Sequence, residues 1–348
     1  MSDRPVHGSV EPGFESVVEI FERSLDKNEI GAAVCAYVDG CKVVDLWGGW
    51  ADAGQTREWH RDTIASTYSA TKGMTATCAH LLVERGLLDV EETVATYWPE
   101  FAQAGKESIT MRMVLSHQAG LPWTTAPPPD KRFDWDTVTA ALAQSAPLWE
   151  PGTRSEYHGG TFGYLVGEVV RRIDGRPLDT FFREEIAEPL GADFMMRFGP
   201  EHDPRCAEIV GDNDFVNTRA WRAAGDGAAT GHGTAESLAR VYGALACGGE
   251  LDGVRLLRAE TIAAALQEQP LLHADGTAGE FGLGYQLFWK LFPGMNEYTF
   301  GHTGMGGSVG LGDTSRRLGI GYVMNRMGSG GAADLVNATY RVLIGSGR

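Results

Sequence analysis

Residues 66–74, with the sequence STYSATKGM, are the most informative segment of the chain. The apolar pattern predicts a helix over about 70–85, so Ser69 lies where that helix begins. Residues three apart share a helix face, which places the Lys72 ammonium within reach of the Ser69 hydroxyl. A serine becomes a good nucleophile once a base takes its proton. A partly buried lysine, with its pKa lowered from ~10.4 toward 7, can be that base.

Taken alone, the S-x-x-K pattern has a second interpretation, in which Ser69 caps the helix and Lys72 lies on the surface. Three further segments favour the catalytic interpretation: LSHQAGLP at 115–122, PGTRSEYHG at 151–159 and FGHTGMGG at 300–307. In this order, the four segments resemble the serine β-lactamase-like superfamily. The resemblance is greatest to the family VIII carboxylesterases, which are related to class C β-lactamases and D-stereospecific peptidases. It extends from about residue 15 to 345.

This resemblance implies a role for each matching position. Ser69 would be the acylated nucleophile, Lys72 its hydrogen-bonded partner and Tyr157 a proton shuttle. Lysine and tyrosine this close would titrate as a pair, so the sequence does not say which one is the base. The segment from His302 to Gly304 takes the place of the family's Lys-Thr-Gly strand, and the backbone N–H groups of Ser69 and Met305 would form the oxyanion hole. The resemblance implies neither a metal nor an organic cofactor.

Two departures from the lactamase pattern favour an ester substrate. Gly159 stands where lactamases carry the asparagine of Tyr-x-Asn, and His302 replaces the lysine of Lys-Thr-Gly. A histidine is mostly neutral at pH 7, so the site lacks a fixed positive charge for an anionic lactam or peptide carboxylate. We expect hydrolysis of short-chain carboxylic esters. The alternatives are a β-lactamase, a D-peptidase or amidase, an acyltransferase of the same fold, or an inactive binding protein. Retention of all three catalytic residues argues against the last.

The expected fold class is α+β, with one antiparallel sheet built from both ends of the chain, flanking helices and an inserted helical region. Asp39-Gly40 between two apolar runs predicts a β-hairpin over 32–47. The resemblance implies a β-lactamase/penicillin-binding-protein-like fold. The chain is expected to form one catalytic unit, 1–348, with a sheet part at about 14–65 and 275–348 and a helical part at about 66–250. Further helices are expected at 14–27, 136–146, 160–173, 178–187, 234–247, 259–267 and 331–344, and further strands at 285–289, 299–301, 308–313 and 318–324.

Several other signals have less specific interpretations. Ser308 lies in Gly-x-Ser-x-Gly, the nucleophile elbow of α/β-hydrolases, but no histidine follows it and the next residues predict a strand. His117 is expected to be a hydrogen-bonded structural residue. Cys78 and His80 are two positions apart on one helix, which suits core packing better than metal binding. Trp123, with Phe133 and Trp135, could line an acyl pocket or anchor a loop.

Composition limits the partners. The chain has 348 residues with 46 acidic and 30 basic side chains, a net charge of −16, which argues against nucleic acid or an anionic membrane as partner. Five cysteines without a C-x-x-C pair fit reduced thiols. No signal peptide and no apolar run of ~18 residues is recognised, so a cytoplasmic location is expected. The expected partner is a small-molecule ester, and the oligomeric state and acyl length are left open.

Overall fold

The hairpin predicted at Asp39-Gly40 is present, and its two strands are neighbours in a seven-stranded sheet. Both turn residues have positive φ, 49° and 77°, as a two-residue hairpin turn requires. The computed structural model describes residues 4–27, 29–123, 128–212, 214–269, 272–328 and 331–345. In it, the sheet has the order β1-β3-β2-β12-β11-β10-β9, with all neighbours antiparallel. The strands are β1 (Val6–Val10), β2 (Gly31–Val38), β3 (Cys41–Gly49), β9 (Gln286–Leu287), β10 (Thr299–Thr303), β11 (Val309–Asp313) and β12 (Leu318–Met324).

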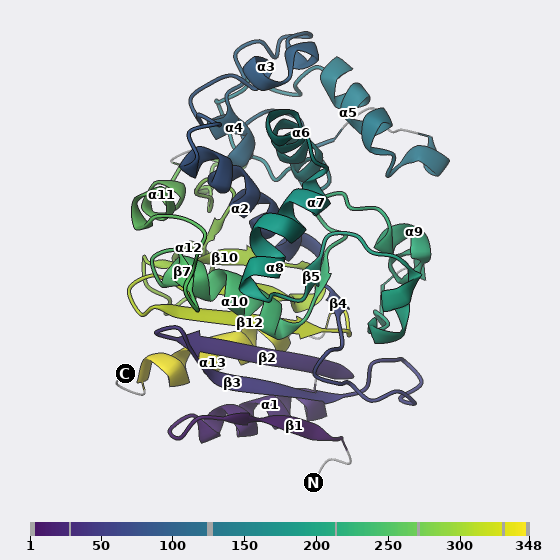
Figure 1. Cartoon of the computed structure of the whole chain (residues 1–348), viewed down its shortest axis with the longest axis vertical. Coiled ribbons are helices and arrows are strands. Elements are labelled where there is room, and N and C mark those ends of the chain that lie inside the picture. Colours follow the sequence, from purple (N-terminus) through teal and green to yellow (C-terminus); the bar gives the residue numbers. More distant parts are fainter. Residues whose placement is uncertain are drawn as a thin grey trace.

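The sheet joins the two ends of the chain, as expected. Strand β2 pairs with β12 across almost three hundred residues of sequence, so the N- and C-terminal segments fold as one layer (Figure 1). Two short sheets lie outside it. They contain β4 (Ala65–Ser66), β5 (Phe194–Met195) and β6 (His232–Gly233) in one, and β7 (Glu250–Leu251) with β8 (Val254–Arg255) in the other.

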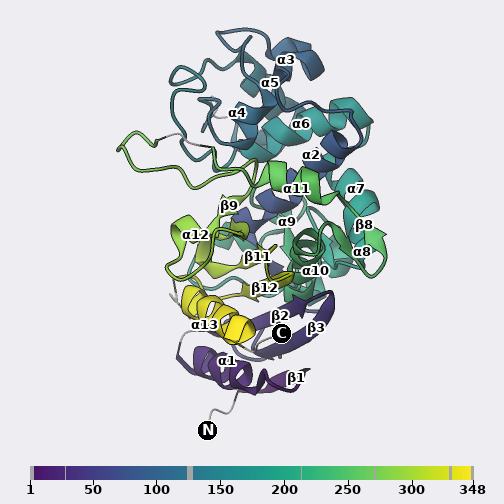
Figure 2. The ribbon, with the colours of Figure 1, turned by 90° about the vertical axis from the view of Figure 1, so that its left-hand side faces the viewer.

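Alternation along β2 assigns its two faces to two cores. Ala32, Val34 and Ala36 pack in the core that holds α1 (Glu15–Lys27) and α13 (Gly331–Gly345). Cys35 and Tyr37 point into the larger core, which contains α10 (Ala235–Ala246). Helices α1 and α13 lie together along one side of the sheet (Figure 2). Helix α10, which comes from a segment between the two halves of the sheet, packs on the opposite face of the sheet.

The remaining helices lie mostly above the sheet (Figure 1). The innermost of them is α2, which carries small residues on every side and has twelve consecutive buried positions. The helices are α2 (Thr71–Glu84), α3 (Val94–Tyr97), α4 (Met111–Leu115), α5 (Trp135–Gln144), α6 (Phe162–Asp174), α7 (Leu178–Phe182), α8 (Glu188–Leu190), α9 (Arg219–Arg222), α11 (Ala259–Ala265) and α12 (Phe288–Leu291).

Two sequence expectations needed correction. The strand expected over 285–289 ends at Leu287, and the chain turns into helix α12 from Phe288. The helix expected over 178–187 is interrupted by a π-helical turn at Arg183–Ala187 and continues to Leu190.

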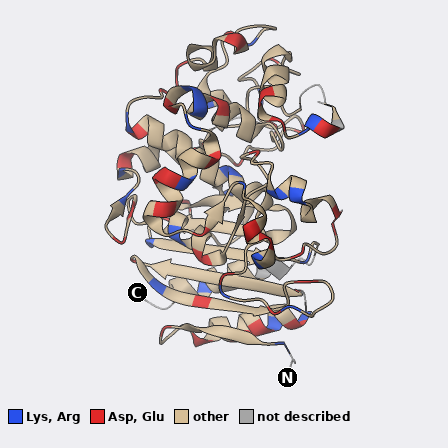
Figure 3. Ribbon diagram, turned by 45° about the vertical axis from the view of Figure 1, so that its right-hand side comes forward, with Lys and Arg blue, Asp and Glu red and all other residues tan. Residues whose placement is uncertain are grey.

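Charged residues are spread over the outer helices and loops, whereas the strands of the main sheet carry few of them (Figure 3). Within the described residues, no helix is both long and apolar enough to cross a membrane.

Candidate active site

Ser69 lies in a short 3-10 turn, Tyr68–Ala70, between β4 and α2. Tyr68 has a left-handed backbone, φ 45°, which is uncommon for a residue with a side chain. Its hydroxyl donates a 2.7 Å hydrogen bond to Asp212, which holds the turn in this conformation. Both neighbours of Ser69 are buried, whereas Ser69 itself is partly exposed. The turn therefore presents one hydroxyl to solvent at the beginning of the central helix.

Lys72 occupies the first turn of α2 and is completely buried. Its Nζ lies 3.2 Å from the Ser69 Oγ and donates a 2.9 Å hydrogen bond to the Ala228 carbonyl. Burial lowers the pKa of Lys72 to about 7, and the nearby Asp226 carboxylate opposes this effect. The spacing of three residues thus brings the two groups together as predicted, and near pH 7 a substantial fraction of Lys72 is the neutral amine.

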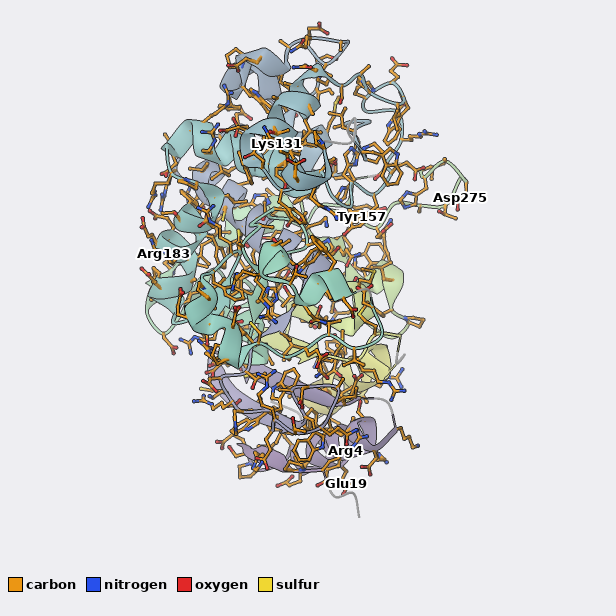
Figure 4. The ribbon with its side chains drawn as sticks, turned by 90° about the vertical axis from the view of Figure 1, so that its right-hand side faces the viewer. Arg4, Glu19, Lys131, Tyr157, Arg183 and Asp275 are labelled. Carbon is orange, nitrogen blue, oxygen red and sulfur yellow. The ribbon has the colours of Figure 1, made fainter. Side chains whose placement is uncertain are left out.

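Tyr157 completes the cluster from the loop that precedes α6, midway along the molecule (Figure 4). Its ring centroid is 4.9 Å from the Lys72 Nζ, and 37% of its side chain is exposed. Burial raises the pKa of Tyr157 to about 12, although a hydrogen bond with Ser69 lowers it. The protein environment therefore moves the two pKa values apart, which favours a neutral phenol beside a readily deprotonated lysine.

His117 holds the backbone on both sides of Tyr157. Its carbonyl accepts from the Glu156 N–H at 3.0 Å, and its Nδ1 accepts from the His158 N–H at 3.1 Å. Burial lowers the pKa of His117 well below its ordinary value, so the ring is neutral with its proton on Nε2. The residue is buried and hydrogen-bonded, as the sequence analysis expected.

The end of β10 brings the third segment to the site. Gly304 lies so close to the turn that carries Ser69 that a Cβ on it would be 2.1 Å from the Thr67 carbonyl oxygen. Ser308, which is fully buried, donates a 2.7 Å hydrogen bond to the same oxygen. This hydrogen bond therefore connects the segment after β10 to the turn that carries Ser69. Ser308 is followed by strand β11, whereas the serine of a nucleophile elbow is followed by a helix.

His302 and Met305 flank this contact. His302 is buried, its Nδ1 donates to the Thr303 carbonyl at 2.8 Å, and its Nε2 has no hydrogen-bond partner among the described residues. Burial, with Lys72 as a second cause, lowers the pKa of His302 to about 3, so this ring is neutral. Met305 begins a 3-10 turn directly after Gly304, and its side chain is 57% exposed.

The three aromatic residues proposed for an acyl pocket have different surroundings. The Trp123 side chain is 69% exposed. Trp135 donates a 2.8 Å hydrogen bond to the buried Glu168 of α6, so it anchors α5 to α6. Phe133 stacks on Phe215 at a centroid distance of 5.7 Å, in a cluster that also includes Trp221.

Two further side chains of α2, those of Cys78 and His80, are packed into the core. His80 is buried with its Nε2 2.8 Å from the Leu283 carbonyl oxygen, and Cys78 is buried as well. Across the part of the chain that the structure describes, no three His, Cys, Asp or Glu side chains gather as metal ligands.

Sequence reasoning missed Asp226, which is 5% exposed and lies in the loop that contacts Lys72. An acidic residue between Gly225 and Gly227 was the available signal. Its significance depends on a contact between segments more than 150 residues apart.

Residues 17–343 match the family described as Beta-lactamase. The chain belongs to this family. It is 36% identical over 365 residues to "Esterase/beta-lactamase LipL" of Mycobacterium tuberculosis, which covers 93% of this chain and 84% of that protein. The crystal structure of a family VIII carboxylesterase superposes with a TM-score of 0.91 at 38% identity, covering 97% of this chain and 100% of the other. A penicillin-binding protein homolog from Caulobacter crescentus gives 0.89 at 36% identity, with coverage of 97% and 100%.

The expected β-lactamase/penicillin-binding-protein-like fold is therefore confirmed, and so is the resemblance to family VIII carboxylesterases. The protein is a hydrolase of the β-lactamase superfamily.

Proposed function

We propose that this protein hydrolyses short-chain carboxylic esters through a covalent acyl-enzyme on Ser69. The observation that carries the proposal is the 3.2 Å approach of the buried Lys72 Nζ to the Ser69 Oγ. A neutral amine at this distance can accept the hydroxyl proton as the oxygen attacks a carbonyl carbon. The pKa of Lys72, lowered by burial to about 7, makes the neutral form accessible at neutral pH.

In the first half-reaction, the Ser69 oxygen bonds to the acyl carbon and its proton passes to Lys72. The carbonyl oxygen becomes an oxyanion, for which the N–H groups of Ser69 and Met305 are the proposed donors. The ester C–O bond then breaks, and the departing alkoxide takes a proton from the Tyr157 hydroxyl, which Lys72 replenishes. Water repeats the sequence in the second half-reaction, so that a carboxylic acid leaves and the Ser69 hydroxyl is restored.

The neutral character of the site favours an ester over an anionic lactam. The pKa of His302, lowered by burial to about 3, leaves the ring uncharged where lactamases of this superfamily carry a lysine. Gly159 offers no side-chain amide to hold a substrate. The similarity to a family VIII carboxylesterase of known structure, at 38% identity, supports the same choice.

Lactam hydrolysis is the second candidate, because the relative from Mycobacterium tuberculosis is named both esterase and β-lactamase. The same acyl-enzyme chemistry would open a β-lactam amide, and Lys72 would protonate the departing nitrogen through Tyr157. The two activities differ in what must be bound beside the reacting carbonyl, so a comparison of substrates separates them.

The test is to measure initial rates on p-nitrophenyl acetate to octanoate, and on nitrocefin, for the wild type and Ser69→Ala. We expect ester turnover to fall by several orders of magnitude in the variant, with the highest wild-type rates on short acyl chains. Ser24→Ala is the matched control, because it removes a buried serine hydroxyl on α1, in the other core, and should retain most of the activity.

Two outcomes would contradict the proposal. Ester turnover that survives Ser69→Ala would exclude this nucleophile and make Ser308 the candidate to test next. Nitrocefin turnover above that of every ester would make lactam hydrolysis the principal activity.

A further inference from the structure

Asp226 has a buried carboxylate that the chemistry described above does not use. A single oxygen, Oδ1, accepts the backbone N–H groups of Ala228, Ala229 and Thr230, at 2.8, 2.8 and 3.0 Å. The Thr230 hydroxyl lies 3.1 Å from the same oxygen and also accepts from the Asp226 N–H at 3.0 Å. One carboxylate thus closes the loop from 226 to 230 on itself.

The loop formed by residues 226–230 binds helix α2, which carries Lys72. The Ala228 carbonyl accepts the 2.9 Å hydrogen bond from the Lys72 Nζ. One residue earlier, the Gly227 carbonyl accepts from the Thr75 hydroxyl at 2.7 Å. The loop therefore accepts hydrogen bonds from two side chains on one face of α2. The position of the Ala228 carbonyl depends on the turn that Asp226 closes.

Helix α6 supports the loop from the other side. A Cβ on Gly163 would lie 2.0 Å from the Asp226 carbonyl oxygen and 2.6 Å from the Ala228 nitrogen, so the two backbones are in direct contact. Glycine is needed there for this approach. The loop that Asp226 closes is thereby held between α2 and α6.

Asp226 differs in charge from the other titratable groups that face Lys72. Those groups are Tyr157 before α6, His117 after α4 and His302 on β10. Burial raises the pKa of Tyr157 and lowers the pKa of both histidines, so all three are neutral near pH 7. A carboxylate among neutral groups in a buried site stabilises a cation formed beside it.

We propose that Asp226 is a positioning residue for the reaction. Its carboxylate fixes the loop that presents the Ala228 carbonyl to Lys72, and its charge stabilises the ammonium that forms when Ser69 loses its proton. The proton moves from the Ser69 oxygen to the Lys72 nitrogen, and Asp226 remains a carboxylate throughout. This inference rests on the proposed function, because it assigns Asp226 a role through Lys72.

The test uses Asp226→Asn, whose amide oxygen can accept the same three N–H groups but carries no charge. The readout is the second-order rate constant for labelling of Ser69 by a fluorophosphonate, measured from pH 5 to 9. Loss of the charge lowers the pKa of Lys72, so the acidic limb of the profile should move to lower pH by roughly 1 unit. Glu19→Gln removes an exposed charge at the far end of the molecule and should leave the limb in place (Figure 4).

An unmoved acidic limb in a folded Asp226→Asn protein would overturn the inference. Asp226→Ser is the second variant, since a serine hydroxyl also accepts loop N–H groups and gives the same test if the asparagine variant does not fold. Thr230→Val weakens the loop without changing its charge, and an equal shift in that variant would also overturn the electrostatic role. Failure of the wild type to be labelled at Ser69 would instead refute the proposed function.

Discussion

Burial of Lys72 should make the free energy of unfolding depend on pH, and a variant without this lysine should lack that contribution. The pKa of Lys72 falls from 10.5 to about 7 because the folded chain removes the ammonium from water. At 1.36 kcal/mol per pKa unit, this change corresponds to about 5 kcal/mol against the folded state whenever Lys72 is protonated. The side chain is fully buried, so solvent does not screen this cost.

The sign of the effect follows from proton counting. Below about pH 7 the lysine carries a proton in both states, and the full cost is present. Between about pH 7 and 10 the unfolded chain binds the proton and the folded chain does not, so stability rises with pH. From pH 7 to 9.5 the contribution of this group should increase the free energy of unfolding by about 3 kcal/mol.

Lys72→Met isolates this contribution, because methionine fills a similar volume without an ionisable group. We expect the difference in unfolding free energy between the wild type and the variant to change by about 3 kcal/mol from pH 7 to 9.5, in favour of the wild type at high pH. Urea denaturation at several pH values measures it. Lys27→Met, an exposed change at the end of α1, should give a difference that does not vary with pH. A difference between the wild type and Lys72→Met that does not vary with pH would refute the reasoning.

Three further variants test other parts of the site and its support. Tyr157→Phe should lower kcat for p-nitrophenyl esters by about 10²–10⁴ with little change in KM, because the shuttle hydroxyl is lost; an unchanged kcat would exclude the role. Gly304→Ala should abolish ester turnover, because its Cβ would meet the Thr67 carbonyl, whereas Gly160→Ala, with no atom within 4 Å of its Cβ, should remain active. Glu168→Ala should lower the free energy of unfolding by about 2–3 kcal/mol in urea titrations, because it leaves a tryptophan N–H and two arginines without their buried acceptor; a change below 0.5 kcal/mol would contradict this (about the scatter of surface substitutions).

Features set by neighbouring residues could be predicted from the sequence. The Asp39-Gly40 turn needs two positive φ angles that these residues tolerate, so the hairpin follows from local chemistry. The Ser69–Lys72 contact follows in the same way from helix geometry. The apolar run after Leu287 was misassigned because its length does not distinguish a strand from a helix. In the structure, Phe288 packs on Phe292 four residues later, a contact that only a helical turn provides.

Other features depend on contacts that the sequence does not display. Strand β1 was missed because it lies at the sheet edge, is largely exposed and contains Gly8 at a φ of 104°. Its pairing with β3 is visible only in the folded chain. Asp226 was missed for a related reason, since an acidic residue in a glycine-rich loop is usually solvated. Its burial results from the approach of α2 and α6 to that loop.

Several residues in and around the site have features that are uncommon in folded proteins. A lysine is fully buried, Tyr68 and His117 have left-handed backbones, and the Nε2 of the buried His302 has no partner among the described residues. Each feature destabilises the fold, by about 1–3 kcal/mol for a strained backbone and by about 5 kcal/mol for the protonated lysine. Features of this kind persist where the surrounding structure over-determines them, and for Lys72 the hydrogen bond to the Ala228 carbonyl contributes to this. In the proposed mechanism, the same burial that weakens the fold would make Lys72 a base near neutral pH, so one group would affect both stability and reactivity.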